Sequence, residues 1–308
     1  MNTGGEPLRA PRDSHALLRR RARWGWVFVA PFVIFLTCFL LIPLVYALVL
    51  SLQNKTLDGT SKWVGLGNYA KVFTDPLFLG GVRLVVLFCL VLIPIQMVVS
   101  LLAALLLDSL SSRFSRFARL MIFVPYAVPA VIGALMWGFL YSPNFGPVKE
   151  VFSLVGLKAP QLLSPDNIFA SLINIVTWGF GGYYMIILYS ALQSIDSSIY
   201  EAAKIDGANY RQIALRIKIP MISSSLVLVL TFALIGTLQF FTEPQILRGM
   251  ASQAISPSYT PNMYAYTQAF AYGQFNYASA ISFSLGLVVF IGSYLFFFFT
   301  RKRNGLKS

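Results

Sequence analysis

Charged residues are scarce in this chain of 308 residues. They make up 11% of the sequence, against about 25% in an ordinary soluble domain, while hydrophobic residues make up 57%. Mean hydropathy is +0.70. This composition excludes an ordinary soluble domain and indicates an integral membrane protein.

Residues that commonly carry catalysis or bind metals are nearly absent. His15 is the one histidine and lies in a polar N-terminal segment, which argues against histidine catalysis and histidine metal sites. Cys38 and Cys89 form no CxxC pair, and each lies in an apolar stretch as a small hydrophobic residue would. The sequence contains no GxxxxGK[ST] run, the phosphate cradle of P-loop ATPases. We therefore expect no catalytic residues, no metal ligands and no cofactor in this chain.

Apolar stretches dominate what is present, and each is long enough for a helix that crosses a bilayer, which takes about 20 residues. They cover residues 24–52, 81–107, 120–141, 168–192, 221–246 and 275–300. The predicted fold is all-α, a polytopic membrane protein with about six transmembrane helices. Its domain runs from 24 to 300, between polar tails at 1–23 and 301–308.

Positive charge sets the expected orientation. The net charge of +13 would suggest nucleic acid in a soluble protein, but loops that stay in the cytoplasm of a membrane protein gather Lys and Arg. Most basic residues lie in the two tails, in the loop before 120 and in the polar segment before 221. We expect both termini and this polar segment in the cytoplasm, and no nucleic-acid partner.

The polar segment at 201–220 reads EAAKIDGANYRQIALRIKIP. It predicts a helix, a turn at Gly207 and a second helix that is stopped or kinked at Pro220. A compact helix–turn–helix at the membrane face suits docking to another protein.

This segment resembles the EAA loop of ABC importer permeases, whose pattern is EAA, three residues, Gly, nine residues, then Ile, one residue and Leu-Pro. Here Ile219 replaces the Leu. The extended form YEAAKIDGA and the preceding ALQSID resemble the carbohydrate-uptake branch, the maltose and glycerol-phosphate type, with Asp196 in place of a Pro. Blocks at 30–52, 65–76 and 264–282 are similar to that branch in the same order, so the resemblance covers most of the chain beyond residue 24. The chain departs from the branch at Arg248-Gly249-Met250, where a Thr-Gly-Gly-Gly-Pro is common, and at Ala214, where Phe is common.

The resemblance implies an ATP-driven importer in which this chain is a permease subunit and not an enzyme. The loop at about 194–220 would couple the permease to an ATPase, through Glu201, Ala202, Ala203, Asp206, Gly207, Ile217 and Pro220. Implied partners are a second permease subunit in a heterodimer, two copies of an ATP-binding subunit that hold ATP and Mg²⁺, and an extracytoplasmic solute-binding protein. The implied location is the cell membrane.

Sugar sites combine aromatic faces with hydrogen-bonding groups, and two of the apolar stretches offer that mixture. In maltose-type permeases the corresponding regions line the substrate path. The candidates here are Asn174, Trp178, Phe180, Gly181, Thr237, Gln239, Phe240 and Glu243. Polar and small residues also hold membrane helices together, so interhelical packing is the alternative role for each.

Two other functions stay open. An ABC permease for glycerol phosphate or a polyamine would need basic or acidic side chains in its path; the apolar stretches hold no basic residue well inside and only Glu243 as an acid. A stand-alone secondary carrier commonly uses a relay of buried acids, which these stretches lack. A neutral carbohydrate carried by an ABC importer is the function that the sequence favours.

Overall fold

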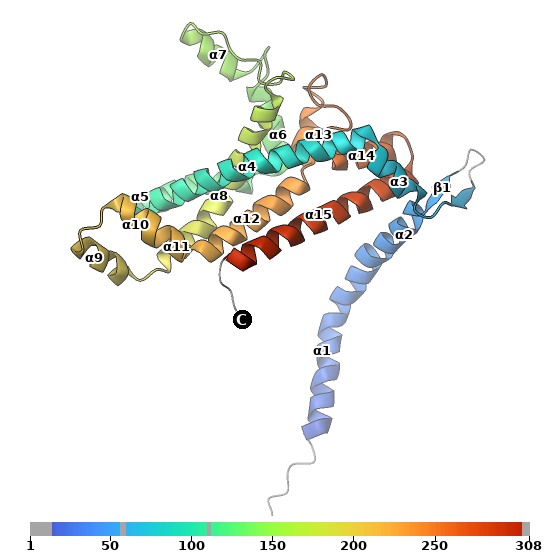
Figure 1. Ribbon diagram of the computed structural model, residues 1–308, viewed down its shortest axis with the longest axis horizontal. Helices are drawn as coiled ribbons and strands as arrows, with labels where there is room; N and C mark the ends of the chain where they lie inside the picture. The colour runs from blue at the N-terminus through green and yellow to red at the C-terminus, as the bar shows by residue number, and fades with distance from the viewer. Residues whose placement is uncertain (1–13, 56–59, 110–111, 304–308) are drawn as a thin grey trace, which may run out of the picture.

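The computed structural model describes residues 14–55, 60–109 and 112–303, and these are almost entirely helical (Figure 1). Most of the predicted tail 1–23 and the end of the tail 301–308 lie outside the described residues. The elements in chain order are α1 (Ser14–Leu36), the π-helical turn η1 (Thr37–Leu41), α2 (Ile42–Ser51), β1 (Gln53–Lys55), β2 (Ser61–Trp63), α3 (Gly67–Thr74), α4 (Pro76–Ser109), α5 (Ser112–Ala127), α6 (Ala130–Leu140), α7 (Pro147–Leu154), α8 (Ile168–Gln193), α9 (Ser197–Ile205), α10 (Tyr210–Ile213), the π-helical turn η2 (Ala214–Lys218), α11 (Ile219–Met221), α12 (Ser223–Leu238), α13 (Thr242–Leu247), α14 (Pro261–Tyr266), the π-helical turn η3 (Thr267–Ala271) and α15 (Phe275–Arg303). The two strands pair as an antiparallel hairpin with Asn54 opposite Lys62.

Five helical segments are long and apolar enough to cross a membrane: Gly25–Ser51, Pro76–Ser109, Ile168–Gln193, Ser223–Leu247 and Phe275–Tyr294. A sixth crossing arises if the bent pair Phe114–Ala127 and Ala130–Leu140 is counted as one span. The prediction of about six spans is therefore confirmed.

The single helix expected over 120–141 is instead two helices, which meet at an angle of 98°. Pro129 adopts φ −54° and ψ 135°, outside the helical region, at the break. Proline cannot donate a backbone hydrogen bond and pushes the preceding residue away from helical geometry. Figure 1 shows the outcome: α5 runs with the bundle, whereas α6 rises out of it and carries α7 at its far end.

The core of the bundle lies where α8 packs against α4, α5 and α12 (Figure 1). The side chains of Leu92, Leu172, Met185 and Leu188 are fully buried there. Gly182 permits the closest helix approach, since a Cβ on it would lie 2.0 Å from the carbonyl oxygen of Ile122 on α5. Small residues at helix crossings are typical of membrane bundles, where tight packing replaces the hydrophobic effect.

The first helical segment stands away from the bundle (Figure 1). None of the most apolar stretch within Gly25–Ser51 is buried, whereas 56% of the corresponding stretch in Ile168–Gln193 is. The turn η1 comes directly before Ile42-Pro43, just as η2 comes directly before Ile219-Pro220. A π-helical turn moves the hydrogen bonding to i→i−5, which adapts the helix to a proline without ending it. At the second site the helix does stop soon after the proline, because α11 ends at Met221 and α12 begins at Ser223, which fits the predicted stop or kink at Pro220.

At the hairpin end of the bundle, one carboxylate joins segments that lie far apart in sequence. The hydroxyls of Tyr264 and Tyr277 each donate to Oδ2 of Asp75 at 2.7 Å. Lys71 Nζ lies 4.4 Å from the centroid of the Tyr277 ring. Burial alone would raise the pKa of Asp75, but these hydrogen bonds, with those from the backbone of the following turn, lower it below its ordinary value. Burial and then Asp75 raise the pKa of Tyr264 to about 12, so its hydroxyl stays a donor.

Two asparagines strengthen the same end. Asn68 Nδ2 donates to the carbonyl oxygens of Ser51 at 2.9 Å and Gln53 at 2.8 Å. Asn276 Nδ2 donates to the Leu50 carbonyl oxygen at 3.0 Å. These bonds tie the end of α2 to α3 and to the start of α15, so the exposed first segment is firmly held at one end.

Asp75→Asn should lower the thermal stability of the purified chain. Asparagine keeps an acceptor oxygen but loses the charge that strengthens both tyrosine hydrogen bonds. Because the site is only half-buried, we expect the free energy of unfolding to fall by about 1 kcal/mol and the Tm by about 2–4 °C. Because the folded pKa is depressed, the contribution is fully present above the unfolded pKa near 3.8 and is lost as the pH falls through the folded value. The measurement is thermal unfolding in detergent at a series of pH values. Asp166→Asn, at an exposed loop carboxylate, is the control and should match wild type. If the Tm of Asp75→Asn stays equally far below that of wild type at acid pH, this account is contradicted.

Candidate functional site

Two adjoining cavities lie beside the break between α5 and α6. The smaller, of about 220 Å³, is enclosed by α4, α8, α12, α13 and the start of α6. The larger, of about 400 Å³, is lined by residues 125–130, 133 and 134 around the break, by α8 and by Glu243. Both are lined by Ala130, Val176, Phe180 and Glu243, so they meet at these side chains. The bend in the chain and the neighbouring α12–α13 junction therefore place two adjoining cavities beside α8, which are together called the hollow below.

Six of the eight predicted path residues line this hollow. The smaller cavity is lined by Phe180, Thr237, Gln239, Phe240 and Glu243, and the larger by Trp178 together with Phe180 and Glu243. The other two serve helix contacts. Asn174 Nδ2 donates to Tyr141 Oη at 2.6 Å. The Gly181 carbonyl oxygen accepts from Ser100 Oγ at 3.0 Å, joining α8 to α4.

Several lining residues were not among the sequence candidates. Tyr126, next to the break, lines the larger cavity; Tyr184, Gln96 and Thr242 line the smaller one. The Tyr126 ring meets the Phe180 ring edge to face at 5.9 Å. Gln96 lies on α4, far from the segments that the resemblance pointed to, and its Nε2 donates to the Val176 carbonyl oxygen at 3.4 Å. Only the folded arrangement brings these residues to the hollow.

Glu243 contributes an acidic side chain to the hollow. Among the described residues, no other Asp, Glu, Lys, Arg or His lines either cavity. Its side chain is half-buried, near the first turn of α13, and no salt bridge joins it to another described residue. The remaining walls are aromatic rings, small apolar residues, amides and hydroxyls. The aromatic rings of such a hollow can stack on a polar solute, and its side-chain oxygen atoms can accept hydrogen bonds from the hydroxyls of that solute.

The polar insert, residues 194–220, lies at the opposite end of the bundle from the hairpin (Figure 1). Asp196 caps α9, because its carboxylate accepts from the Ser198 backbone N–H at 2.9 Å. This hydrogen bond and one from the Ser198 side chain lower the pKa of Asp196. This cap gives a structural role to Asp196, at the position where the carbohydrate-uptake branch has Pro. Gly207 follows α9 with φ +81°, and a Cβ there would meet nothing within 4 Å, so the turn and not crowding requires glycine. Asn209 and Gln212 then form a capping box that starts α10.

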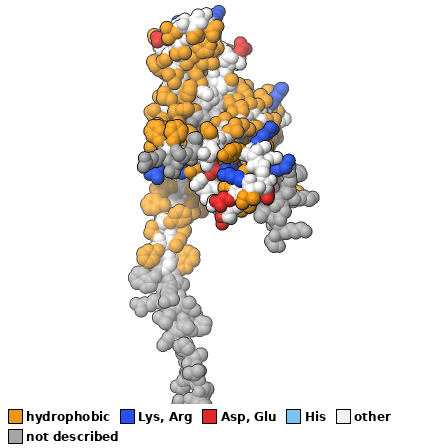
Figure 2. All heavy atoms as spheres, turned by 90° about the vertical axis from the view of Figure 1, so that its left-hand side faces the viewer, with side chains coloured by type: hydrophobic (Ala, Val, Ile, Leu, Met, Phe, Trp, Pro, Cys, Tyr) orange, Lys and Arg blue, Asp and Glu red, His pale blue; other side chains and the backbone are white. Residues whose placement is uncertain are grey.

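The predicted coupling residues lie on one accessible projection. Glu201, Ala202, Asp206, Gly207 and Pro220 are exposed, and Ala203 and Ile217 are half-buried. Ile205 and Tyr210, which flank the turn, expose 87% and 80% of their surface and were not among the candidates. Figure 2 faces this end of the bundle and shows charged side chains of both signs gathered beside hydrophobic surface. Large exposed apolar side chains ringed by charge are typical of a protein-docking surface.

Comparison with known proteins identifies the family. A family model described as the binding-protein-dependent transport system inner membrane component matches residues 96–303. The chain belongs to this family. It is a multi-pass membrane protein and a transport component of the inner membrane.

Several relatives match nearly the whole permease. It is 33% identical over 285 residues to the lactose transport system permease protein LacF of Rhizobium radiobacter, covering 91% of this chain and 95% of the relative. It is 28% identical over 271 residues to the sn-glycerol-3-phosphate transport system permease protein UgpA of Pectobacterium atrosepticum, covering 87% and 91%. Among solved structures, a bacterial alginate ABC transporter in complex with an alginate pentasaccharide-bound periplasmic protein contains a chain that superposes with a TM-score of 0.80 at 20% identity, covering 94% of this chain and 98% of that one. That likeness establishes the shared fold.

Proposed function

We propose that this permease is one transmembrane subunit of an ATP-driven importer of neutral carbohydrates. It forms half of the translocation path with a second permease subunit, and its polar insert docks on separate ATPase subunits, present as two copies. A solute-binding protein on the outer side delivers the sugar. In this proposal the insert, the N-terminus and the C-terminus face the cytoplasm, and ATP and Mg²⁺ are held by the partners.

One observation carries the proposal: the permease joins an exposed docking projection to a hollow within the bundle. Ile205 and Tyr210 beside Glu201 and Asp206 offer apolar anchors with charges around them. The turn at Gly207 holds α9 and α10 in a fixed relation, as a lever needs. A partner that moves this projection as a rigid body can therefore act on the spans that enclose the hollow.

The chemistry of the hollow favours a neutral sugar over an anionic solute. Trp178, Phe180 and Tyr126 contribute aromatic rings, and Gln239 and Thr242 contribute amide and hydroxyl groups. Phosphate esters and carboxylates are bound by Arg and Lys, neither of which lines the described cavities. Glu243 would repel such anions, whereas its oxygens accept hydrogen bonds from sugar hydroxyls. Lactose, the sugar for which one relative is named, belongs to the class that fits.

Glu243→Ala should raise the KM for uptake of a neutral disaccharide such as lactose by about tenfold or more, since hydrogen bonds to charged groups contribute about 1.5–3 kcal/mol. Glu243→Gln keeps an oxygen acceptor and should cost less. The measurement is initial uptake by proteoliposomes that contain the full complex. A lower maximal rate at unchanged KM would contradict sugar binding and assign Glu243 to a gate instead. Leu90→Ala, at an exposed apolar site outside both cavities, is the control.

The proposal as a whole is tested by affinity purification of the permease from its native membranes, with mass spectrometry of the proteins that accompany it. A second permease and a P-loop ATPase are the expected companions, and a co-purifying solute-binding protein leads to the sugar through its own ligand. Recovery of this chain alone, under conditions in which a known ABC importer stays intact, would overturn the proposal. A stand-alone carrier would then be the better explanation.

A further inference from the structure

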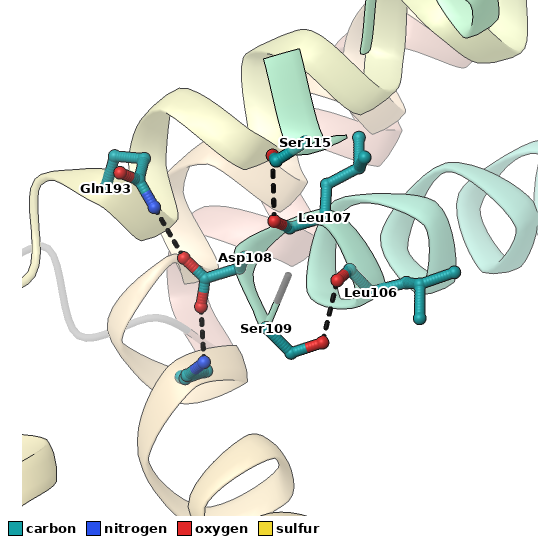
Figure 3. A network of polar contacts seen from close by, with 7 residues as sticks. Leu106, Leu107, Asp108, Ser109, Ser115 and Gln193 are labelled. Atoms are coloured by element: carbon teal, nitrogen blue, oxygen red, sulfur yellow. Dashed lines mark hydrogen bonds and ion pairs between the residues drawn. The ribbon is translucent and has the colours of Figure 1, made fainter. Parts of the chain in front are cut away.

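A buried carboxylate joins the polar insert to two spans. Asp108 lies near the end of α4, and its Oδ2 forms an ion pair with Lys218 Nζ at the end of η2. Its Oδ1 accepts a hydrogen bond from Gln193 Nε2, the last residue of α8, at 2.6 Å. Figure 3 shows both interactions meeting at the one carboxylate. The side chains of Asp108 and Lys218 are only 7% and 16% exposed.

The surroundings hold this carboxylate and its partner in place. Lys218 Nζ lies 4.9 Å from the centroid of the Tyr200 ring, which belongs to α9, so the ammonium group also touches the first helix of the insert. Ser115 Oγ donates to the Leu107 carbonyl oxygen at 2.9 Å and fixes the chain next to Asp108 (Figure 3). Because both charges are largely withdrawn from water, their attraction is screened far less than that of a surface pair. Breaking the pair leaves a buried, unpaired charge, which disfavours separation of the three elements.

The two helices joined at Asp108 lead directly to the hollow. Leu92 and Gln96 lie on α4, and Val176 and Phe180 lie on α8, and all four line the smaller cavity. Gln96, at the cavity, and Ser100, between the cavity and Asp108, each bond α4 to α8. The two helices therefore form one braced unit, which can carry a displacement from the insert to the cavity walls.

We propose that Asp108 is a positioning residue that transmits movement of the polar insert to α4 and α8. Its role rests on the proposed docking of the insert to an ATPase. The covalent connections of the insert run into α8 on one side and through η2 and α11 into α12 on the other. The bonds at Asp108 add α4, which has no direct chain connection to the insert. Without them, movement of the insert would reach α4 only through packing.

The test measures how accessible the cavity is to a thiol reagent, and it needs no known solute. A cysteine replaces Gly179, which lines the larger cavity and has open space at its Cβ, in a background where Cys38 and Cys89 are serine. The full complex in nanodiscs is labelled with a thiol reagent, with and without ATP and vanadate. In the otherwise wild-type complex, nucleotide trapping should change the labelling rate by about 5-fold or more, a usual size of coupling between distant sites. Trapped nucleotide is quantified in the same samples.

Asp108→Ala should abolish this change while nucleotide is still trapped. The exchange of partners, Asp108→Lys with Lys218→Asp, should restore it, because the ion pair is rebuilt with opposite polarity. Glu150→Ala, at an exposed carboxylate outside the insert, is the control. A full nucleotide-dependent change in Asp108→Ala would overturn the positioning role, as would failure of the exchanged pair to restore it in a complex that assembles and traps nucleotide. Absence of trapped nucleotide in the parent complex would instead refute the proposed docking to an ATPase, so the two failures are distinguishable.

Discussion

Gly207→Pro should abolish ATP-driven uptake while the permease still reaches the membrane. Gly207 has φ +81°, and proline fixes φ near −65°, so the turn between α9 and α10 has to rearrange. Enforcing the native turn would cost about 3 kcal/mol or more, which corresponds to a fall of about 100-fold in the population that can dock. The site is exposed and far from the core, so folding of the spans should be unaffected. The measurement is uptake of labelled lactose by cells or proteoliposomes, normalised to the amount of permease in the membrane.

Gly207→Asn is the matched control for this variant. Asparagine tolerates a left-handed backbone, and no atom lies within 4 Å of the position of its Cβ, so it should keep most of the uptake. Full uptake by Gly207→Pro, at normal membrane levels, would show that the insert does not drive transport. That result would return the stand-alone carrier to consideration.

Gly182→Ala should destabilise the bundle itself. The added Cβ would lie 2.0 Å from the Ile122 carbonyl oxygen and 2.9 Å from the Phe123 Cα. Backbone atoms cannot turn aside as a flexible side chain can, so α5 has to move away from α8. Overpacking of this kind costs about 1–3 kcal/mol, which corresponds to a fall in Tm of about 2–12 °C for a chain of this size. Thermal unfolding of the detergent-solubilised permease, followed by the loss of its monodisperse chromatographic peak, measures the effect.

Gly179→Ala separates crowding from helix propensity. Gly179 lies one turn earlier on the same helix, and nothing lies within 4 Å of an added Cβ. Alanine there should keep or slightly raise the Tm, since glycine within a helix is less favourable than alanine by about 1 kcal/mol. Equal destabilisation by the two substitutions would contradict the close contact between α5 and α8.

The sequence was most informative where structure follows from local physics. Long apolar runs predicted the spans, because a helix must satisfy every backbone hydrogen bond inside lipid. The turn at Gly207 followed from a glycine between two helix-forming stretches. The break near Pro129 was missed, although that residue was visible, because apolar residues continue through it and proline within a membrane helix often only kinks it. Direction of bending depends on α8 and α13, against which α6 packs.

The site was predictable only in part, because α8 has neighbours on several sides. Trp178 and Phe180 line the hollow, whereas Gly181, the residue after Phe180, contacts α4. A sequence pattern gives the residues of one helix face, but it does not say which neighbour that face meets. The pair Asp108 and Lys218 carries no local signal, since its members are separated by much of the chain. Such contacts are products of the fold.

The break between α5 and α6 has a consequence for hydration of the permease. The last carbonyl groups of α5 and the first N–H groups of α6 have no partners within their helices. Lipid tails cannot supply them, so such backbone persists in a membrane only where protein or water does so. Residues 125–130 line the larger cavity, and we expect water in that cavity to serve the backbone groups of the break that no protein group satisfies. An arriving solute would have to displace that water, so its own polar groups would have to replace the hydrogen bonds that the water made.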